Sequence, residues 1–252
     1  MPPPQARVHP RFLAPDLDPG AAEARLPPDE SRHLTRVLRL GPGAVVALFD
    51  GHGRECLARV TDARADRVVL AIIERTAPAA PPQVPLTLVQ AVLKGAAMDD
   101  VVRDATMMGV AGIQPVMTEH VAVKTVLATR AGNVDRWRRI AVASAKQSRR
   151  ATIPVIAAPV EIARALAVDE GGLRLIFVEP SAGRDTRTLR SLLDRPAPVA
   201  VTLLLGPEGG WAAGEIDLAV QRGAVPVSLG SLTLRADAMP IAAIAAVRML
   251  WE

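Results

Sequence analysis

The sequence predicts an α/β protein in which a small β-rich domain precedes a larger domain built on a mainly parallel sheet. From residue 86 onward, short apolar stretches alternate with segments of helical periodicity, and repeated βα units of this kind are typical of a parallel sheet. Before residue 77, several stretches with strand character follow one another, and Asp50-Gly51 between two of them is a hairpin signal. A proline-rich segment separates the two regions.

The amino-terminal domain is expected to span residues 1–76. A short helix is predicted over residues 29–40, and Gly41-Pro42-Gly43 would end it. Three strands are predicted after it, which suits a small barrel, at residues 45–49, 54–61 and 67–74. Residues 77–85, APAAPPQVP, favour an extended, semi-rigid spacer, so the domain boundary is placed there.

The second domain is expected to span residues 86–252. Its strands are predicted at residues 86–92, 110–116, 153–157, 173–178, 198–205 and 224–229. Its helices are predicted at residues 97–108, 133–148 with Asn133 as the cap, 161–167 and 213–221. A last helix would begin near Pro240, with Asp237 as a plausible cap. That helix is apolar nearly all round, which predicts burial in the core or against a second subunit.

Composition narrows the class of protein without deciding it. The net charge of +4 and a pI near 10.1 favour an anionic partner such as nucleic acid, although only weakly. Aromatic residues make up only 2%, which disfavours base stacking on an aromatic platform. Cys56 is the single cysteine, so neither an internal disulfide nor a Cys-based zinc site is expected, and with only four scattered histidines no metal site is predicted. With no signal peptide and no apolar run of about 18 residues, we expect a soluble cytoplasmic protein that does not enter a membrane.

Two glycine-containing loops are the candidate ligand site. Residues 206–210, GPEGG, follow an apolar strand, and residues 229–240, LGSLTLRADAMP, follow another. In α/β sheets, ligands bind at the carboxyl ends of strands, and glycine lets the backbone approach them closely. The spacing matches neither common phosphate loop, and Glu208 favours a ligand with positive charge over a polyphosphate. The alternative is a tight strand-to-helix turn that binds nothing.

The two loops resemble a known signature. LLLGPEGGW followed by LGSLTLRADA is similar to the IGPEGG, LG and LRTETA elements of the ribosomal small-subunit RNA methyltransferase E family, which belongs to the knotted SPOUT methyltransferases. The departures are Ala236, Asp237, Ala238 and Met239, where Thr, Glu, Thr and Ala or Thr are usual. Further matches run from Arg11 to Arg248 and include RVLRLGPG, LFDG, Lys94-Gly95, ATMMGV and KQSR. In the last two, Met107 and Lys146 stand where Glu is usual, which indicates an altered polar contact or a more basic RNA face.

The resemblance implies a fold, an activity and a cofactor. We expect a PUA-like RNA-binding barrel, followed by a SPOUT-type α/β domain with a trefoil knot. We also expect the protein to form a homodimer. The implied reaction is S-adenosylmethionine-dependent methylation of N3 of a uridine in 16S ribosomal RNA. Arg235 would stabilise negative charge on a uracil carbonyl oxygen, and Asp237 would orient Arg235 or accept the proton. The residues expected to hold the cofactor are Leu205, Gly206, Pro207, Glu208, Gly209, Gly210, Leu229, Gly230, Leu232, Leu234 and Glu179.

Basic side chains are the candidate contacts to 16S rRNA in the small ribosomal subunit. Arg32, Arg36 and Arg39 recur at helical spacing with His33 beside them, which predicts phosphate contacts or simply a solvated face. Arg149 and Arg150 fit either phosphate contacts or a charged helix end. The remaining candidates are Arg11, Lys94 and Lys124. Two rival functions remain open: an RNA methyltransferase with another target, and an RNA-binding ribosome-assembly factor without turnover.

Overall fold

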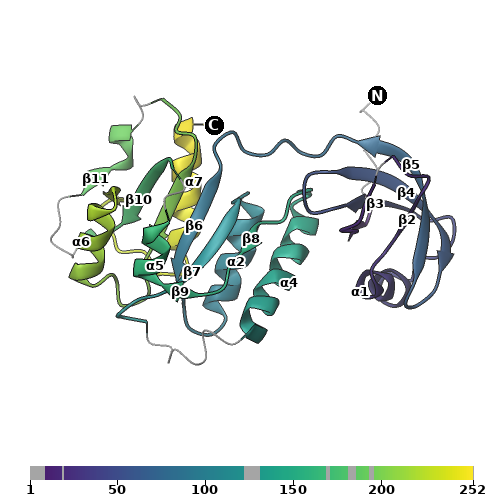
Figure 1. Cartoon of the computed structure of the whole chain (residues 1–252), viewed down its shortest axis with the longest axis horizontal. Coiled ribbons are helices and arrows are strands. Elements are labelled where there is room, and N and C mark those ends of the chain that lie inside the picture. The colour runs from purple at the N-terminus through teal and green to yellow at the C-terminus, as the bar shows by residue number, and fades with distance from the viewer. Residues whose placement is uncertain are drawn as a thin grey trace. The chain divides into compact units, whose positions relative to one another are not determined.

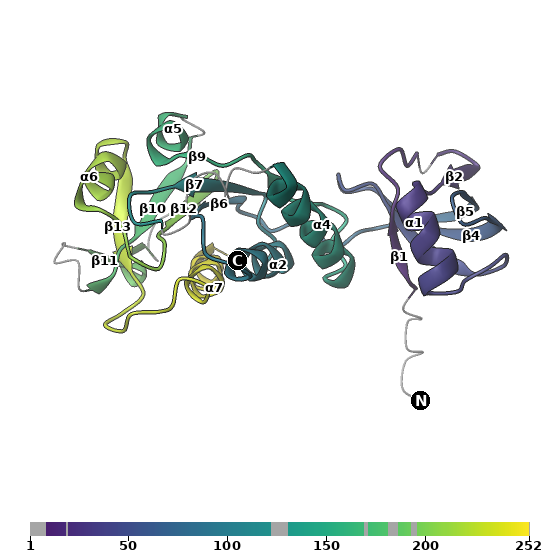
Figure 2. The same ribbon diagram turned by 90° about the horizontal axis from the view of Figure 1, so that it is seen from below.

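The computed structural model describes residues 9–18, 20–121, 131–168, 171–180, 186–192 and 196–251 (Figures 1 and 2). The chain forms two compact units. Unit 1 consists of Met1–Ala80 together with Ala145–Ile153, and unit 2 consists of Pro81–Ser144 together with Pro154–Glu252. The units divide near the proline-rich segment, but a short segment from far along the chain belongs to the first unit.

Unit 1 is built on a curled five-stranded sheet with the order β1-β3-β4-β5-β2. Its strands are β1 (Arg11–Leu13), β2 (Glu23–Arg25), β3 (Val45–Phe49), β4 (Glu55–Ala63) and β5 (Val68–Thr76). β1 and β3 are parallel, and the other pairs are antiparallel. Register shifts in the β4–β5 pair, such as that between Leu57 and Ala58, increase the local twist and help the sheet to curl.

The first helix closes the inner face of this sheet. α1 (Pro28–Arg32) continues into the π-helical turn η1 (His33–Val37), so the helix ends before the predicted residue 40. Leu34 is fully buried in a cluster with Phe12, Leu48 and Leu70. The buried Ser31 hydroxyl donates to the Leu26 carbonyl at 3.2 Å and accepts the Val68 N–H at 3.0 Å, which fastens the helix to the strands.

Residues 145–153 complete the core of unit 1. Ala145 and Ala151 pack against Phe49, and the Ile153 N–H donates to the Gly51 carbonyl at 2.9 Å. The Lys146 ammonium forms an ion pair with Glu30, with 2.7 Å between Nζ and Oε2. Lys146 therefore binds residues 145–153 to the first helix within unit 1. The contribution of residues 145–153 to this unit was not predicted from the sequence.

Unit 2 is built on an eight-stranded sheet with the order β11-β13-β10-β12-β6-β7-β8, and β9 also pairs with β7. The strands are β6 (Leu86–Ala91), β7 (Gly112–Met117), β8 (Val155–Ile156), β9 (Val160–Glu161), β10 (Leu173–Phe177), β11 (Arg187–Thr188), β12 (Val201–Leu205) and β13 (Ala224–Ser228). Every pairing between these strands is parallel. β12, β6 and β10 are mostly buried, as expected for strands with both faces covered.

Helices cover both faces of this sheet (Figure 2). α5 (Ile162–Ala167) and α6 (Ala213–Gln221) lie on one face, where Ile162 and Ile216 pack against Leu204. α2 (Ala97–Met107) and α7 (Met239–Trp251) pack together on the other face. The described residues also form α4 (Ala131–Gln147) and the 3₁₀ turn η3 (Leu189–Leu192).

The predicted α/β class, with a mainly parallel sheet after a small curled β domain, is confirmed. α6 lies on the predicted residues, but α4 begins at Ala131, so Asn133 lies inside it and is not its cap. The trefoil knot stays a prediction from the family resemblance.

Candidate functional site

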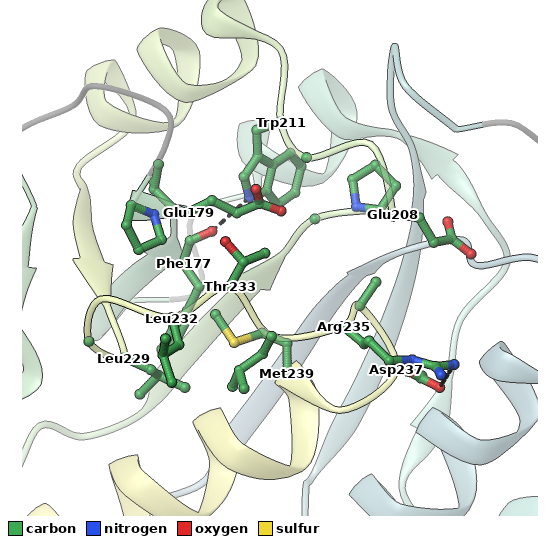
Figure 3. A pocket seen from close by; sticks show the side chains of 18 of the residues that line it. Phe177, Glu179, Glu208, Trp211, Leu229, Leu232, Thr233, Arg235, Asp237 and Met239 are labelled. Carbon is green, nitrogen blue, oxygen red and sulfur yellow. Dashed lines mark hydrogen bonds and ion pairs between the residues drawn. The ribbon is translucent and has the colours of Figure 1, made fainter.

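A cavity of about 320 Å³ lies at the carboxyl ends of three neighbouring strands in unit 2, β13, β10 and β12 (Figure 3). Its walls come from residues 177–180 at the end of β10, from two loops, and from Ala97 of α2 and Met239 of α7. We call residues 206–212 after β12 the glycine loop and residues 229–238 after β13 the arginine loop. The size falls within the range of small-molecule sites, and the position is the one where α/β sheets bind ligands.

Most of the residues expected to bind the cofactor meet at this cavity. Those that line it are Gly206, Pro207, Glu208, Gly210, Leu229, Gly230, Leu232, Leu234 and Glu179. Two do not line it. Leu205 is 1% exposed and packs in the core, and Gly209 lies against His120. Both catalytic candidates, Arg235 and Asp237, are also part of the lining.

Several other residues line the cavity that were not predicted from the sequence to bind a ligand. They are Ala97, Phe177, Val178, Pro180, Trp211, Thr233, Ala236 and Met239. Thr233, Ala236 and Met239 lie within residues 229–240, and Trp211 directly follows residues 206–210, so their position in the sequence was an available signal. Phe177, Val178 and Pro180 surround Glu179 at the end of β10, and only the pairing of β10 with both β12 and β13 brings them here.

The glycine loop is held by contacts with neighbouring segments. The Trp211 Nε1–H donates to the Phe177 carbonyl at 3.0 Å, which ties the loop to the end of β10. The Glu208 Oε1 accepts the backbone N–H of Lys94 at 3.1 Å, which ties it to the segment after β6. In Figure 3 the Glu208 carboxylate points away from the centre of the cavity. Glu208 thus braces the loop, a role that its sequence position alone does not show.

Two glycines in this loop are required by geometry. A Cβ at Gly206 would approach the indole nitrogen of Trp211 to 3.2 Å, so a side chain there would displace the ring. Gly210 has a φ of +71°, which strains residues with a side chain. The motif therefore encodes the shape of this turn, whatever ligand it binds.

Arg235 and Asp237 form a two-pronged ion pair at the edge of the cavity (Figure 3). Arg235 Nε lies 3.0 Å from Asp237 Oδ1, and Nη2 lies 2.8 Å from Oδ2. The Arg235 side chain is 85% exposed, so it can still reach a ligand. The hydrogen bond from Arg235 lowers the pKa of Asp237 below its usual 3.8. A carboxylate stabilised in this way is a weaker base, which favours the orienting role over the proton-accepting one.

Arg11 is mostly buried within unit 1. Its side chain is only 10% exposed and forms an ion pair with Glu55 at 2.8 Å. It also donates to the Arg150 carbonyl at 3.0 Å and lies over the Phe49 ring, 5.0 Å from the centroid. Because breaking such a buried pair would leave a charge without its partner, Arg11 contributes to the packing of unit 1, and a phosphate contact at this residue stays a prediction.

Most of the other basic candidates are exposed. Arg32, His33, Arg36 and Arg39 are exposed on α1 and the turn after it, with Arg32 paired to Asp29. Lys94 and Arg149 are exposed, whereas Arg150 is half-buried and donates to the Thr152 hydroxyl at 3.2 Å. Lys124 lies outside the described residues.

Neither a metal centre nor a membrane span is found in the part of the chain that the structure describes. These residues hold no group of three or more His, Cys, Asp or Glu side chains placed to bind a metal ion. None of their helices combines the length and apolar character needed to cross a bilayer.

The chain is similar to known RNA methyltransferases over most of its length. Residues 80–248 match the family model of the RNA methyltransferase domain, and residues 26–73 match that of the RNA methyltransferase PUA domain. The ribosomal RNA small subunit methyltransferase E of Synechocystis is 33% identical over 87% of this chain and 71% of its own length. The chain therefore belongs to the ribosomal RNA small subunit methyltransferase E family.

Solved structures agree with this assignment. The ribosomal RNA small subunit methyltransferase E of Neisseria gonorrhoeae, bound to S-adenosyl methionine, is 32% identical with a TM-score of 0.85, covering 97% of this chain and 98% of that one. A putative methyltransferase from Legionella pneumophila, in complex with the cofactor SAM, is 28% identical with a TM-score of 0.86, covering 96% and 98%.

Proposed function

We propose that this protein transfers a methyl group from S-adenosylmethionine to N3 of a uridine in the 16S rRNA of the small ribosomal subunit. The observation that carries the proposal is the meeting of the glycine loop and the Arg235–Asp237 pair at one cavity, in a chain that belongs to this family. Two similar solved structures hold S-adenosylmethionine.

The residues around the cavity fit this cofactor. Leu229, Leu232 and Met239 offer apolar surface for an adenine ring. Glu179 and Asp237 are carboxylates in the lining besides Glu208, which points away from the centre, and Arg235 is its sole basic side chain among the described residues. This charge balance suits a sulfonium and an ammonium better than a polyphosphate.

The chemistry divides between the cofactor and the protein. The sulfonium supplies an already activated methyl group. The protein must orient the uracil and stabilise negative charge as N3 loses its proton. The exposed guanidinium of Arg235 can donate to a uracil carbonyl oxygen, and Asp237 holds the guanidinium in place through two hydrogen bonds.

Unit 1 supplies the proposed RNA contacts. Its match to a PUA domain supports a role in RNA binding, and the exposed Arg32, Arg36 and Arg39 would contact phosphates. Phosphate contacts of this kind position the RNA without reading its sequence, so unit 1 alone would not select the target nucleotide.

We also propose a homodimer. Ile241 on α7 is 40% exposed and Met249 is 82% exposed, although the helix is apolar nearly all round. An exposed apolar helix face is stabilised when a second copy covers it. Sedimentation velocity tests this proposal, and a monomer at micromolar concentration would contradict it.

The test of the reaction uses labelled S-adenosylmethionine and small ribosomal subunits from a strain without the endogenous enzyme. Digestion and mass analysis would locate the label in the RNA. We expect label on N3 of a single 16S uridine. Label on another nucleotide would support the rival with a different RNA target. No label and no cofactor binding would favour a ribosome-assembly factor without turnover.

A further inference from the structure

We propose that His120 is a positioning residue that holds the glycine loop in its cofactor-binding shape. His120 is 86 or more residues away from the loop in sequence, and no motif of the family resemblance includes it. The inference rests on the proposed function, because it assumes that the loop binds S-adenosylmethionine. It adds a residue outside the cavity lining to the machinery of that site.

The first observation is a hydrogen bond shared between two glycines. The His120 Nδ1 lies 3.1 Å from the Gly209 carbonyl oxygen and 3.2 Å from that of Gly210. Because a carbonyl oxygen can only accept, Nδ1 must carry the proton and donate it to both. The two carbonyls belong to the middle of the glycine loop, and Gly210 lines the cavity.

The second observation is direct packing between the same groups. A Cβ added to Gly209 would lie 3.0 Å from the Cβ of His120 and 3.5 Å from its carbonyl oxygen. The absence of a side chain at Gly209 is therefore what lets the two segments approach. This contact also explains why Gly209 belongs to the motif although it does not line the cavity.

The segment that carries His120 is itself anchored. It follows β7 as a turn closed by the Val121 N–H, which donates to the Thr118 carbonyl at 3.2 Å. Val121 is half-buried and packs against Val92 and Met117. The imidazole is thus presented by a fixed backbone, as a positioning role requires.

A single carboxylate joins this turn to the far end of the glycine loop. Glu215, in the first turn of α6, accepts the Glu119 N–H with Oε1 and the Ala212 N–H with Oε2, both at 2.9 Å. The turn therefore contacts the loop at its middle through His120 and at its end through Glu215. Since His120 does not line the cavity, it acts on a ligand only through the loop.

Fixing this loop matters because glycine-rich backbone has more conformational freedom to lose than any other. A loop that is already held in its binding shape does not lose that freedom when the ligand binds, so affinity is higher. Removal of the imidazole donor should weaken S-adenosylmethionine binding about 3- to 10-fold, the range for one exposed hydrogen bond.

The test is calorimetric titration of the full-length protein with S-adenosylmethionine. His120→Asn keeps an N–H donor at the position of Nδ1, whereas His120→Leu and His120→Phe remove it and keep apolar bulk. We expect the leucine and phenylalanine variants to bind about 3- to 10-fold more weakly, and the asparagine variant to stay within about twofold of wild type. Two donor-free variants cover the case in which one of them fails to fold.

If His120 had only a structural role, all three substitutions would lower the melting temperature of the ligand-free protein. The size of this loss would then be the same whether or not the new side chain can donate a hydrogen bond. Equal affinity of wild type and both donor-free variants would overturn the inference while leaving the proposed function standing. The inference would also be overturned if His120→Asn lost as much affinity for S-adenosylmethionine as His120→Leu. Failure of the wild-type protein to bind S-adenosylmethionine would overturn the proposed function and this inference together.

Discussion

The glycine loop and the arginine loop face the same cavity but are held in different ways. Through Glu208 and His120 the glycine loop is bonded to the segments after β6 and β7, and through Trp211 it is bonded to the last residue of β10. In the arginine loop, the hydrogen bonds among the described residues are local. They join Arg235 to Asp237 and to the first turn of α7.

The two loops also differ in how much of each is exposed to solvent. Pro207 and Ala212 are buried, whereas residues 230–235 are exposed and Leu232 is 80% exposed. A large apolar side chain left in water is stabilised when a ligand or a second subunit covers it. We infer that the glycine loop is formed before the ligand arrives and that the arginine loop completes its packing on binding. We therefore propose that the glycine loop is a preformed support for the cofactor, and that the arginine loop carries the reacting side chains, Arg235 and Asp237, besides apolar contacts to the cofactor.

The largest predicted effect is on the arginine loop. Arg235→Ala should lower kcat about 10²- to 10³-fold, because the variant loses the donor to the developing charge. Its Kd for S-adenosylmethionine should change far less, since the glycine loop and the apolar residues proposed to contact the cofactor are unchanged. Single-turnover methylation and calorimetry measure the two quantities. A collapse of cofactor affinity with little change in kcat would contradict the assignment.

The next effect concerns the packing of the glycine loop. Gly209→Ala should raise the Kd for S-adenosylmethionine about tenfold, because its Cβ would meet His120 at 3.0 Å and force the two segments apart. Gly214→Ala is the matched control, since a Cβ there meets nothing within 4 Å. Equal affinities for the two variants would show that the approach of His120 does not shape the site.

A smaller effect is expected at Asp237, where the role of the carboxylate is in question. Asp237→Asn should lower kcat about tenfold, because one prong of the ion pair with Arg235 weakens. The pKa of Asp237 is below 3.8, so the carboxylate stays ionised at higher pH. The pH profile of kcat should therefore keep its shape in the variant above about pH 5. The disappearance of an acid limb in that range would show that Asp237 accepts the proton.

The smallest effect is expected from Glu208. Glu208→Ala removes the acceptor for the Lys94 N–H and should raise the Kd for S-adenosylmethionine about threefold. Glu208→Gln keeps a carbonyl oxygen at the same position and should bind as wild type does. If the glutamine variant loses as much affinity as the alanine variant, the negative charge of Glu208 matters, and it would then act on the cofactor directly.

Local pattern was enough to predict the periodic elements. β3 and α6 lie on the predicted residues, because an apolar run and a helical repeat are both recognisable within about ten consecutive residues. β1 and β2 have three residues each, too few for a period to emerge, and they were not predicted. The π-helical turn that ends the first helix has no sequence signal of its own.

The part of the candidate site that lies within the two sequence motifs was predicted from the sequence. The glycine and arginine loops were identified because glycine, proline and a lone arginine follow apolar strands, and β10 between β12 and β13 brings them together. Contacts between distant residues gave no such signal. His120 with Gly209 spans 89 residues and Lys146 with Glu30 spans 116. The sequence likewise does not show that Arg11 is mostly buried, paired with Glu55 and placed over the Phe49 ring.

The most direct test of the division between the loops measures kcat and the Kd for S-adenosylmethionine in Arg235→Ala and His120→Leu side by side. We predict a crossed result. Arg235→Ala should lose turnover and keep its affinity, and His120→Leu should lose affinity and keep most of its turnover at saturating cofactor. If both variants change the same parameter, the two loops act as one unit and the proposed division is wrong.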